Sequence, residues 1–449
     1  MEVVVVSREF VKPYSPTPNH LKIHKLSLLD QFVPTLYVPL VLFYTIEEAD
    51  RAATTPSRMI QLLKQSLSET LPLFYPLAGK INGDGLSIEC DDEGVLLVEA
   101  RAEFALSRLL HRPDFETVRK FLPCAAAWRR VEVGDRVAMI QATAFPCGGV
   151  VVGVLISHAA ADGASFATFL KGWAAAARKT GEAPRPSFDA STLFIQNKAF
   201  SEEDTFFGVC PVNRGRYGTR RLVFDASTMA RLKAEAANVG VQNPTRAEVV
   251  TALICKSLTA TMTKVSGLDK PVVFTNAVNL RRRAVPNFHD DSMGNYVWLP
   301  TFLCPLEEKD YDGLPSLIGW LREAKSKIDG EFVRGLEGDG GFNALQDALG
   351  EMREFLARTD RLVTFSSWCN FGHYEIDFGW GRPAWVSPVG FPEESGNLIV
   401  NTVLLLDTRC RKGIEAWVFI DEQELEVLEQ NEELTEYASI NPPVSEIED

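Results

Sequence analysis

Residues 150–163, VVVGVLISHAAADG, carry the clearest fold signal in this chain. The continuous β-branched run predicts a buried strand that ends at His158, and Asp162 follows four residues later. Apolar residues then recur at helical spacing between Phe166 and Ala177, so we expect a helix directly after the strand. A histidine at a strand end has a fixed backbone, and imidazole titrates near pH ~6.5. His158 is therefore a candidate general base.

Each residue of this pair also has a simpler interpretation. A histidine at a strand end is more often an ordinary core or surface residue than a catalytic one. Asp162 precedes the expected helix, where an aspartate commonly caps free backbone N–H groups. The spacing His-x-x-x-Asp is a weak signal by itself, and a catalytic interpretation needs support from elsewhere in the chain.

Motifs far from this stretch supply that support. The segment 377–381 reads DFGWG, the segment 75–80 reads YPLAGK, and the segment 279–281 reads NLR. Together with HAAADG at 158–163, they resemble the signature elements of the plant BAHD acyltransferases, which move an acyl group from a coenzyme A thioester to an alcohol or amine. Order, spacing and total length agree, so the resemblance covers essentially the whole chain.

The resemblance implies an α/β fold of two chloramphenicol-acetyltransferase-like lobes, with the active site in a channel between them. Residues 1–200 are expected to form the N-terminal lobe with the HxxxD motif. Residues 201–221 would be a crossover linker, and residues 222–449 the C-terminal lobe with the DFGWG motif. In this family part of the carboxy-terminal chain crosses to the first lobe. The residues alone predict only an α/β protein of two lobes.

The resemblance also implies a mechanism. His158 would take the proton of the acceptor while the acceptor oxygen attacks the thioester carbon. Trp368 and Ser366 match family positions that contact the tetrahedral intermediate. Asp162 would point away from the imidazole and pair with Arg281, which makes it a structural residue rather than a member of a catalytic triad.

Two further motifs receive indirect roles from the resemblance. The DFGWG segment lies away from the reacting atoms in the family, so Asp377, Gly379, Trp380 and Gly381 are expected to shape the donor site indirectly. Lys256 stands at a basic position that family members often use near the coenzyme A phosphates, and a solvated helix lysine is the alternative.

Composition restricts the partners. The formal net charge of −14 argues against nucleic acid or an anionic membrane as a general partner. The eight cysteines contain no Cys-x-x-Cys pair, which favours reduced thiols in the cytoplasm. The histidines show no metal-ligand spacing, and no apolar run is long enough to span a bilayer. We expect a cytoplasmic monomer with no metal and no tightly bound cofactor, which uses acyl-CoA as a co-substrate.

The acyl group and the acceptor are less constrained. The family's anthocyanin-acylating branch carries Tyr-Phe-Gly-Asn-Cys where this chain has SMGNY at 292–296. The segments 25–31 and 277–281 most resemble the branch that contains vinorine synthase. We expect transfer of acetyl from acetyl-CoA to a hydroxyl, or an amine, of a plant specialised metabolite. The alternatives are a hydroxycinnamoyl- or benzoyl-CoA transferase, an inactive coenzyme A-binding regulator, and a peptide-synthetase condensation domain.

Local patterns predict several elements of the second half. Thr245 and Glu248 form a Thr-x-x-Glu capping box ahead of an apolar helix. A glycine-rich surface loop is expected over 335–341, and the tail after 443 is expected to be disordered. Strands are expected around 361–369, 397–406 and 414–420, with an acidic helix from about Glu422.

Overall fold

The computed structural model describes residues 1–46, 54–124, 128–181, 183–210, 216–306, 312–390 and 400–444. The chain divides into two compact units, and each is drawn from several stretches of sequence. Unit 1 comprises Met1–Lys198, His289–Tyr296 and Phe371–Val389, whereas unit 2 comprises Ala199–Phe288, Val297–Asn370 and Gly390–Asp449. Both units contain late stretches of the chain, so neither is one continuous half.

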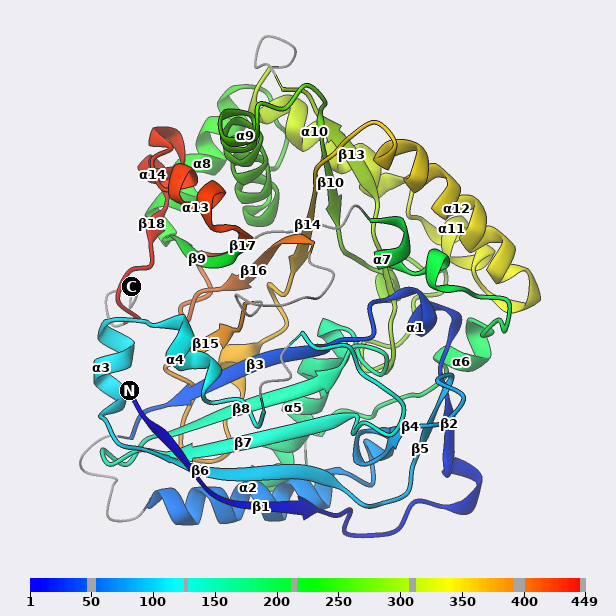
Figure 1. The fold of residues 1–449 in the computed structure, drawn as a ribbon, viewed down its shortest axis with the longest axis vertical. Coiled ribbons are helices and arrows are strands. Elements are labelled where there is room, and N and C mark those ends of the chain that lie inside the picture. Colours follow the sequence, from blue (N-terminus) through cyan, green and yellow to red (C-terminus); the bar gives the residue numbers. More distant parts are fainter. Residues whose placement is uncertain are drawn as a thin grey trace. The chain divides into compact units, whose positions relative to one another are not determined.

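Unit 1 is built on a six-stranded sheet of order β1-β6-β7-β8-β3-β15 (Figure 1). Neighbouring strands are antiparallel except for the parallel pair β6 and β7. A smaller sheet, of order β2-β5-β4, lies in the same unit. The strands are β1 (Val3–Val11), β2 (Ile23–Lys25), β3 (Tyr37–Tyr44), β4 (Lys80–Ile81), β5 (Ser87–Glu89), β6 (Val95–Ala102), β7 (Ala138–Ala144), β8 (Val150–Ser157) and β15 (Trp385–Pro388).

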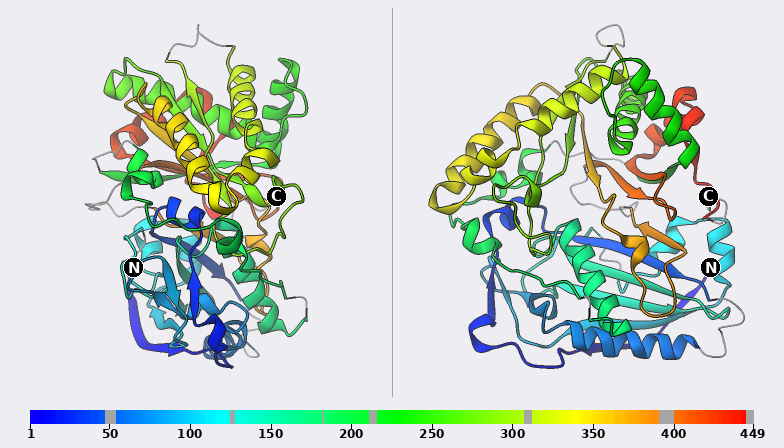
Figure 2. Two further views of the ribbon diagram at one scale, coloured as in Figure 1. Left: turned by 90° about the vertical axis from the view of Figure 1, so that its right-hand side faces the viewer. Right: turned by 180° about the vertical axis from the view of Figure 1, so that it is seen from behind.

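Helices α2 and α5 pack against each other and cover one face of this sheet (Figure 2). The indole nitrogen of Trp173, on α5, donates to the Leu63 carbonyl oxygen of α2 at 3.2 Å. The helices of the unit are α1 (Leu28–Phe32), α2 (Pro56–Thr70), α3 (Leu106–His111), α4 (Phe115–Arg119), α5 (Gly163–Arg178) and α6 (Ala190–Leu193).

The predicted strand and helix around His158 are confirmed as β8 and α5. All eight residues of β8 are buried, in line with its unbroken apolar run. Gly153 within this strand permits a close approach, because a Cβ atom there would lie 2.0 Å from the Phe121 carbonyl oxygen. The backbone at Phe121 therefore packs directly on β8, which makes the strand a rigid support for the residue at its end.

Unit 2 contains a seven-stranded sheet of order β13-β10-β14-β16-β17-β9-β18. The central pairs β10–β14 and β14–β16 are parallel, and the flanking pairs are antiparallel. A short ladder joins β11 to β12. The strands are β9 (Tyr217–Phe224), β10 (Val272–Asn276), β11 (Val278–Asn279), β12 (Val297–Trp298), β13 (Thr301–Cys304), β14 (Leu362–Ser367), β16 (Asn401–Asp407), β17 (Ile414–Asp421) and β18 (Ser439–Ile440).

The long helix α9 is the centre of the helical layer of this unit and contacts α8, α10, α13 and α14 (Figure 1). Its apolar face is buried in the main core of the unit, with Leu253, Ile254 and Leu258 fully buried. The helices are α7 (Phe206–Val209), α8 (Ala226–Asn238), α9 (Arg246–Ser266), α10 (Leu314–Ser326), α11 (Gly330–Gly335), α12 (Gly341–Leu356), α13 (Glu422–Leu428) and α14 (Glu432–Tyr437).

The predicted capping box is present at the start of α9, where Glu248 donates its backbone N–H to Thr245 Oγ1 at 3.2 Å. Other expectations differ in detail. Strand β9 begins at Tyr217, inside the segment expected to be a linker. Residues Gly338–Gly340 form a 3-10 turn and Leu336 is 1% exposed, so the expected surface loop is largely folded. Of the tail after 443, Val444 is buried and residues 445–449 lie outside the described residues.

Candidate active site

His158 lies immediately after β8, and its backbone is fixed from two sides. Its N–H donates to the Leu36 carbonyl oxygen at 2.7 Å, while its own carbonyl oxygen accepts from Asn295 Nδ2, also at 2.7 Å. The side chain remains partly exposed although the residues on both sides of it are buried. The residue is therefore held in position and half-buried.

The orientation of the Asn295 amide determines the tautomer of His158. Asn295 Nδ2 donates to Asp30 Oδ1 and to the His158 carbonyl oxygen, each at 2.7 Å, and both partners are acceptors. Asn295 Oδ1 is then the atom that lies 3.0 Å from His158 Nδ1, and a carbonyl oxygen only accepts. The Nδ1 atom must carry the proton, so Nε2 holds the free lone pair of the neutral imidazole.

A buried carboxylate, Asp30, holds Asn295 in this orientation. Its Oδ1 accepts from the Asn295 backbone N–H at 2.9 Å, in addition to the hydrogen bond from Asn295 Nδ2. Its Oδ2 accepts from Ser27 N and Ser27 Oγ at 2.7 Å each. Burial raises the pKa of Asp30 from its usual range, while these hydrogen bonds lower it. The hydrogen-bonded series Asp30, Asn295 and His158 connects α1 to the end of β8.

Asp162 has a different set of partners. Its Oδ1 accepts from the Ser165 backbone N–H at 2.8 Å, which makes it the N-cap of α5. Its Oδ2 accepts from the Tyr296 backbone N–H at 3.1 Å, next to Asn295. The Ser165 hydroxyl also donates to the Gly294 carbonyl oxygen at 2.9 Å. The carboxylate therefore ties the start of α5 to the segment that carries Asn295.

Burial also sets the protonation of His158. Desolvation lowers the pKa of His158 below its ordinary value of 6.5, and the Coulombic interaction with Asp162 and the hydrogen bond to Asn295 oppose this shift. The imidazole is neutral at pH 7 and can accept a proton at Nε2. A neutral, oriented imidazole is the form that a general base requires.

Sequence reasoning missed Asp30 and Asn295. The serine and aspartate of 27–30 form a capping box at the start of α1, and this Ser-x-x-Asp pattern could have marked Asp30 as a helix residue without indicating its link to His158. Asn295 lies in the segment 292–296 compared above, but nothing local links it to His158, because its partners lie 137 and 265 residues away in the sequence.

The DFGWG segment forms a turn in unit 1. Asp377 Oδ1 accepts from the backbone N–H of Gly379 at 2.7 Å and of Gly381 at 2.9 Å, and both glycines have positive φ angles of 108° and 106°. Phe378 is fully buried and packs edge-on against Trp173, with ring centroids 4.8 Å apart. The turn thus packs on α5 and is held by its own backbone hydrogen bonds.

This turn lies at the far end of α5 from His158. Arg178, the last residue of the helix, donates to the Asp377 carbonyl oxygen, whereas His158 precedes the first turn. A helix of that length spans roughly 24 Å. Trp380 stacks on Phe378 with centroids 5.6 Å apart. Asp377, Phe378 and Trp380 thus pack together at the end of α5 that is opposite to His158.

The remaining candidate residues belong to unit 2. Ser366, on β14, is half-buried, and Trp368 is 8% exposed and donates its backbone N–H to Leu405. Arg281 is 1% exposed, and its Nη1 donates to Asn279 Oδ1 at 3.2 Å. Lys256 Nζ lies 2.7 Å from Glu433 Oε2. A coenzyme A phosphate at Lys256 would therefore have to replace or join this ion pair.

Comparison with known proteins shows which family this chain belongs to. A family model described as Transferase family matches residues 1–435. The chain belongs to this family. Limonoid 7-O-acetyltransferase of Citrus sinensis is 44% identical over 98% of this chain and 99% of its own length. Epi-neemfruitin B 7-O-acetyltransferase of Melia azedarach is 43% identical, again over 98% and 99%.

A solved structure extends the likeness to three dimensions. The crystal structure of vinorine synthase has a TM-score of 0.80 and 33% identity, over 98% of this chain and 99% of that one. These findings confirm the expected BAHD family and its α/β acyltransferase fold. They also confirm the expected enzyme class, an acyl-CoA-dependent O-acyltransferase that uses acyl-CoA as a co-substrate.

No described helix is both long and apolar enough to cross a membrane.

Proposed function

We propose that this enzyme transfers acetyl from acetyl-CoA to a hydroxyl group of a polycyclic terpenoid alcohol. The choice of acetyl rests on the two relatives above, which are both named as 7-O-acetyltransferases and match over nearly their full lengths. The choice of a terpenoid rests on the limonoid in the name of the first. Relatives named for alkaloid chemistry, such as akuammiline synthase 2 of Alstonia scholaris, are 35% identical. A terpenoid alcohol is therefore favoured over an alkaloid.

The chemistry is carried by the hydrogen bond between His158 Nδ1 and Asn295 Oδ1 at 3.0 Å. That bond leaves Nε2 free to take the acceptor's hydroxyl proton while the oxygen attacks the thioester carbon. The bond from oxygen to carbon forms, and the carbonyl π pair moves onto the carbonyl oxygen. Positioned proton transfer of this kind contributes about 10²–10⁴-fold to a rate.

The tetrahedral intermediate then collapses. The oxyanion re-forms the carbonyl, the carbon–sulfur bond breaks, and coenzyme A leaves as a thiolate that takes the proton from the His158 imidazolium. Trp368 and Ser366 are proposed as contacts to the oxyanion. Loss of one such donor typically costs around 10²–10³-fold in rate.

Three further assignments stay proposals. Asp162 and Arg281 are proposed to pair and to hold the chain around His158 in shape, and Lys256 is proposed to contact a coenzyme A phosphate. The enzyme is proposed to act as a cytoplasmic monomer. The absence of any Cys-x-x-Cys pair in the sequence supports the cytoplasmic location. Light scattering on a sizing column tests the monomer directly.

A mass-resolved screen tests the function. Wild type and His158→Ala are incubated with acetyl-, malonyl-, benzoyl- and hydroxycinnamoyl-CoA and with pooled limonoid and alkaloid alcohols. We expect an acetyl ester of a limonoid-type alcohol from wild type and none from the variant. An ester made only from an aromatic acyl-CoA, or only on an alkaloid, would replace the proposed donor or acceptor. Coenzyme A binding without turnover of any donor would indicate a regulatory relative.

A further inference from the structure

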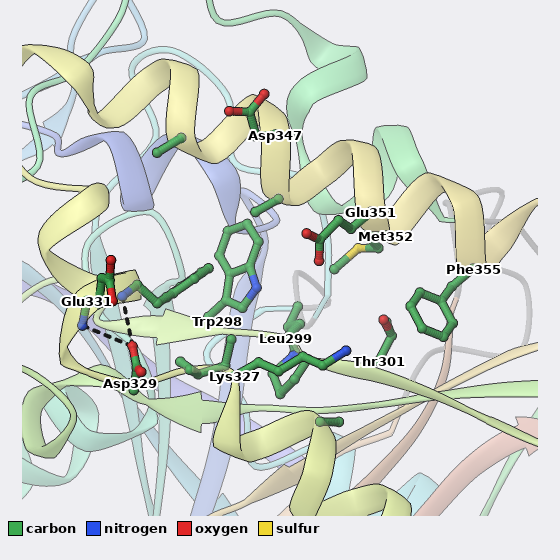
Figure 3. Close-up of a pocket in the computed structure, with 16 residues that line it drawn as sticks. Trp298, Leu299, Thr301, Lys327, Asp329, Glu331, Asp347, Glu351, Met352 and Phe355 are labelled. Atoms are coloured by element: carbon green, nitrogen blue, oxygen red, sulfur yellow. Dashed lines mark hydrogen bonds between the residues drawn. The ribbon is translucent and has the colours of Figure 1, made fainter.

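Unit 2 contains a cavity of about 590 Å³ whose lining includes none of the residues proposed above for acyl transfer (Figure 3). Its walls come from four places: the segment 298–301 at β12 and β13, the carboxy-terminal end of α10, the start of α11, and one face of α12. A cavity of this size lies within the range of small-molecule sites. Because four separate elements line it, the cavity is part of the fold rather than a loop gap.

The floor of the cavity is apolar and aromatic. Trp298 and Met352 both line the cavity, and each is only 3% exposed. The Trp298 ring packs against Phe332, with centroids 5.4 Å apart, and Phe355 closes one side (Figure 3). Aromatic faces of this kind bind flat apolar groups and also attract organic cations.

The rim carries mostly negative charge. Four carboxylates line the cavity, from Asp329, Glu331, Asp347 and Glu351, against a single cation, Lys327. Asp329 Oδ1 already accepts from two backbone N–H groups at the start of α11. The other three carboxylates are exposed, and within the described part of the chain none of them forms a hydrogen bond or an ion pair through its side chain.

The placement of Asp347 and Glu351 is unfavourable without a partner. They stand four residues apart on α12 and line the same cavity, and like charges at that spacing destabilise a helix. A cation bound between them would remove this repulsion. The same carboxylates repel phosphates, so this cavity does not suit the phosphate groups of coenzyme A.

From the aromatic floor and the uncompensated rim, we propose that this cavity binds a small amphipathic organic cation, with a flat apolar body and a protonated amine. The apolar body lies against the half-buried rings of Phe332 and Phe355, and the ammonium lies between Asp347 and Glu351. A smaller hollow of about 290 Å³ shares Thr301, Lys327 and other lining residues with the cavity, which leaves room for a larger ring system. The proposal goes beyond the acyl transfer and does not depend on it.

Calorimetric titration with three probes that share one indole body tests this site. Tryptamine is a cation at pH 7, tryptophol is neutral and indole-3-acetate is an anion. We expect tryptamine to bind at least fivefold more tightly than tryptophol, indole-3-acetate to bind least, and the tryptamine affinity to fall with added salt. Equal affinity for tryptamine and tryptophol would overturn the proposal.

Variants locate the binding. Asp347→Asn combined with Glu351→Gln is expected to weaken tryptamine roughly five- to tenfold and to leave tryptophol unchanged. The matched control, Asp339→Asn with Glu354→Gln, changes the net charge equally at exposed carboxylates that do not line the cavity. Equal weakening in rim and control variants would mean a general charge effect and would contradict the site.

His158→Ala separates this site from the catalytic one. Tryptamine binding is expected to be unchanged in that variant, because His158 is not among the residues that line the cavity. Loss of tryptamine binding in His158→Ala, with the rim variants unaffected, would assign the cation to the reaction site and overturn the proposal. Failure to find an acyl acceptor would leave these binding results intact, so the two proposals fail separately.

Discussion

Replacing Asn295 with alanine tests how the His158 imidazole is held. The change removes Oδ1, which lies 3.0 Å from His158 Nδ1, and it removes the Nδ2 donor to Asp30 and to the His158 carbonyl oxygen. Asp30 keeps three donors: the backbone N–H of residue 295, Ser27 N and Ser27 Oγ. The variant is therefore expected to fold, with a lowered melting temperature.

The effect on turnover follows from the change of charge during the reaction. In the transition state the imidazole becomes an imidazolium, so the bond from Nδ1 to Asn295 becomes charge-assisted. Hydrogen bonds to charged groups contribute about 1.5–3 kcal/mol, and each 1.36 kcal/mol is a factor of ten in rate. We expect kcat to fall roughly 10- to 150-fold, with little change in the KM for acyl-CoA.

Product formation by mass spectrometry, on protein whose folded fraction is known from circular dichroism, measures this loss. Asn82→Ala is the matched control, because it also removes a side-chain amide from unit 1. The Asn82 amide lies in a turn and donates to Ser87 Oγ at 3.0 Å. A kcat for Asn295→Ala within twofold of the control would show that the amide does not orient the base. A loss explained entirely by the unfolded fraction would show the same.

Three more predictions concern the same site. His158→Ala is expected to keep the wild-type melting temperature and to lose turnover by at least about 10²-fold, which parallel thermal and product assays would reveal. Asp162→Ala removes the acceptor for the Ser165 and Tyr296 N–H groups, so it is expected to lose about 1–3 kcal/mol of folding free energy in urea unfolding; unchanged stability with a large loss of kcat would instead assign Asp162 to catalysis. Burial lowers the pKa of His158, so the acid limb of kcat/KM is expected below pH 6.5, and an acid limb above pH 6.5 would contradict that direction. The stability that neutral His158 contributes is present above pH 6.5 and is lost as pH falls through its lowered pKa in the folded state.

Several elements could be predicted because their signals are short-range. The unbroken apolar run of β8 and the helical spacing of α5 are properties of neighbouring residues, and both elements form where they were expected, with β8 ending at Ser157, one residue before His158. The Thr245–Glu248 capping box needs only residues three apart, and it is present. The expected surface loop over 335–341 does connect two helices and has exposed residues, but Leu336 is buried and Gly338–Gly340 form a 3-10 turn.

The sequence by itself determined the family, the strand and helix that flank His158, and the candidate base, because apolar periodicity, capping and motif order can all be observed along the chain. Only the tertiary structure decided the protonation pattern of that base. Asn295 lies 137 residues from His158 and 265 from Asp30, and their hydrogen bonds exist only after the chain has folded. Burial, which lowers the pKa of His158, is likewise a property of the packed unit rather than of any segment.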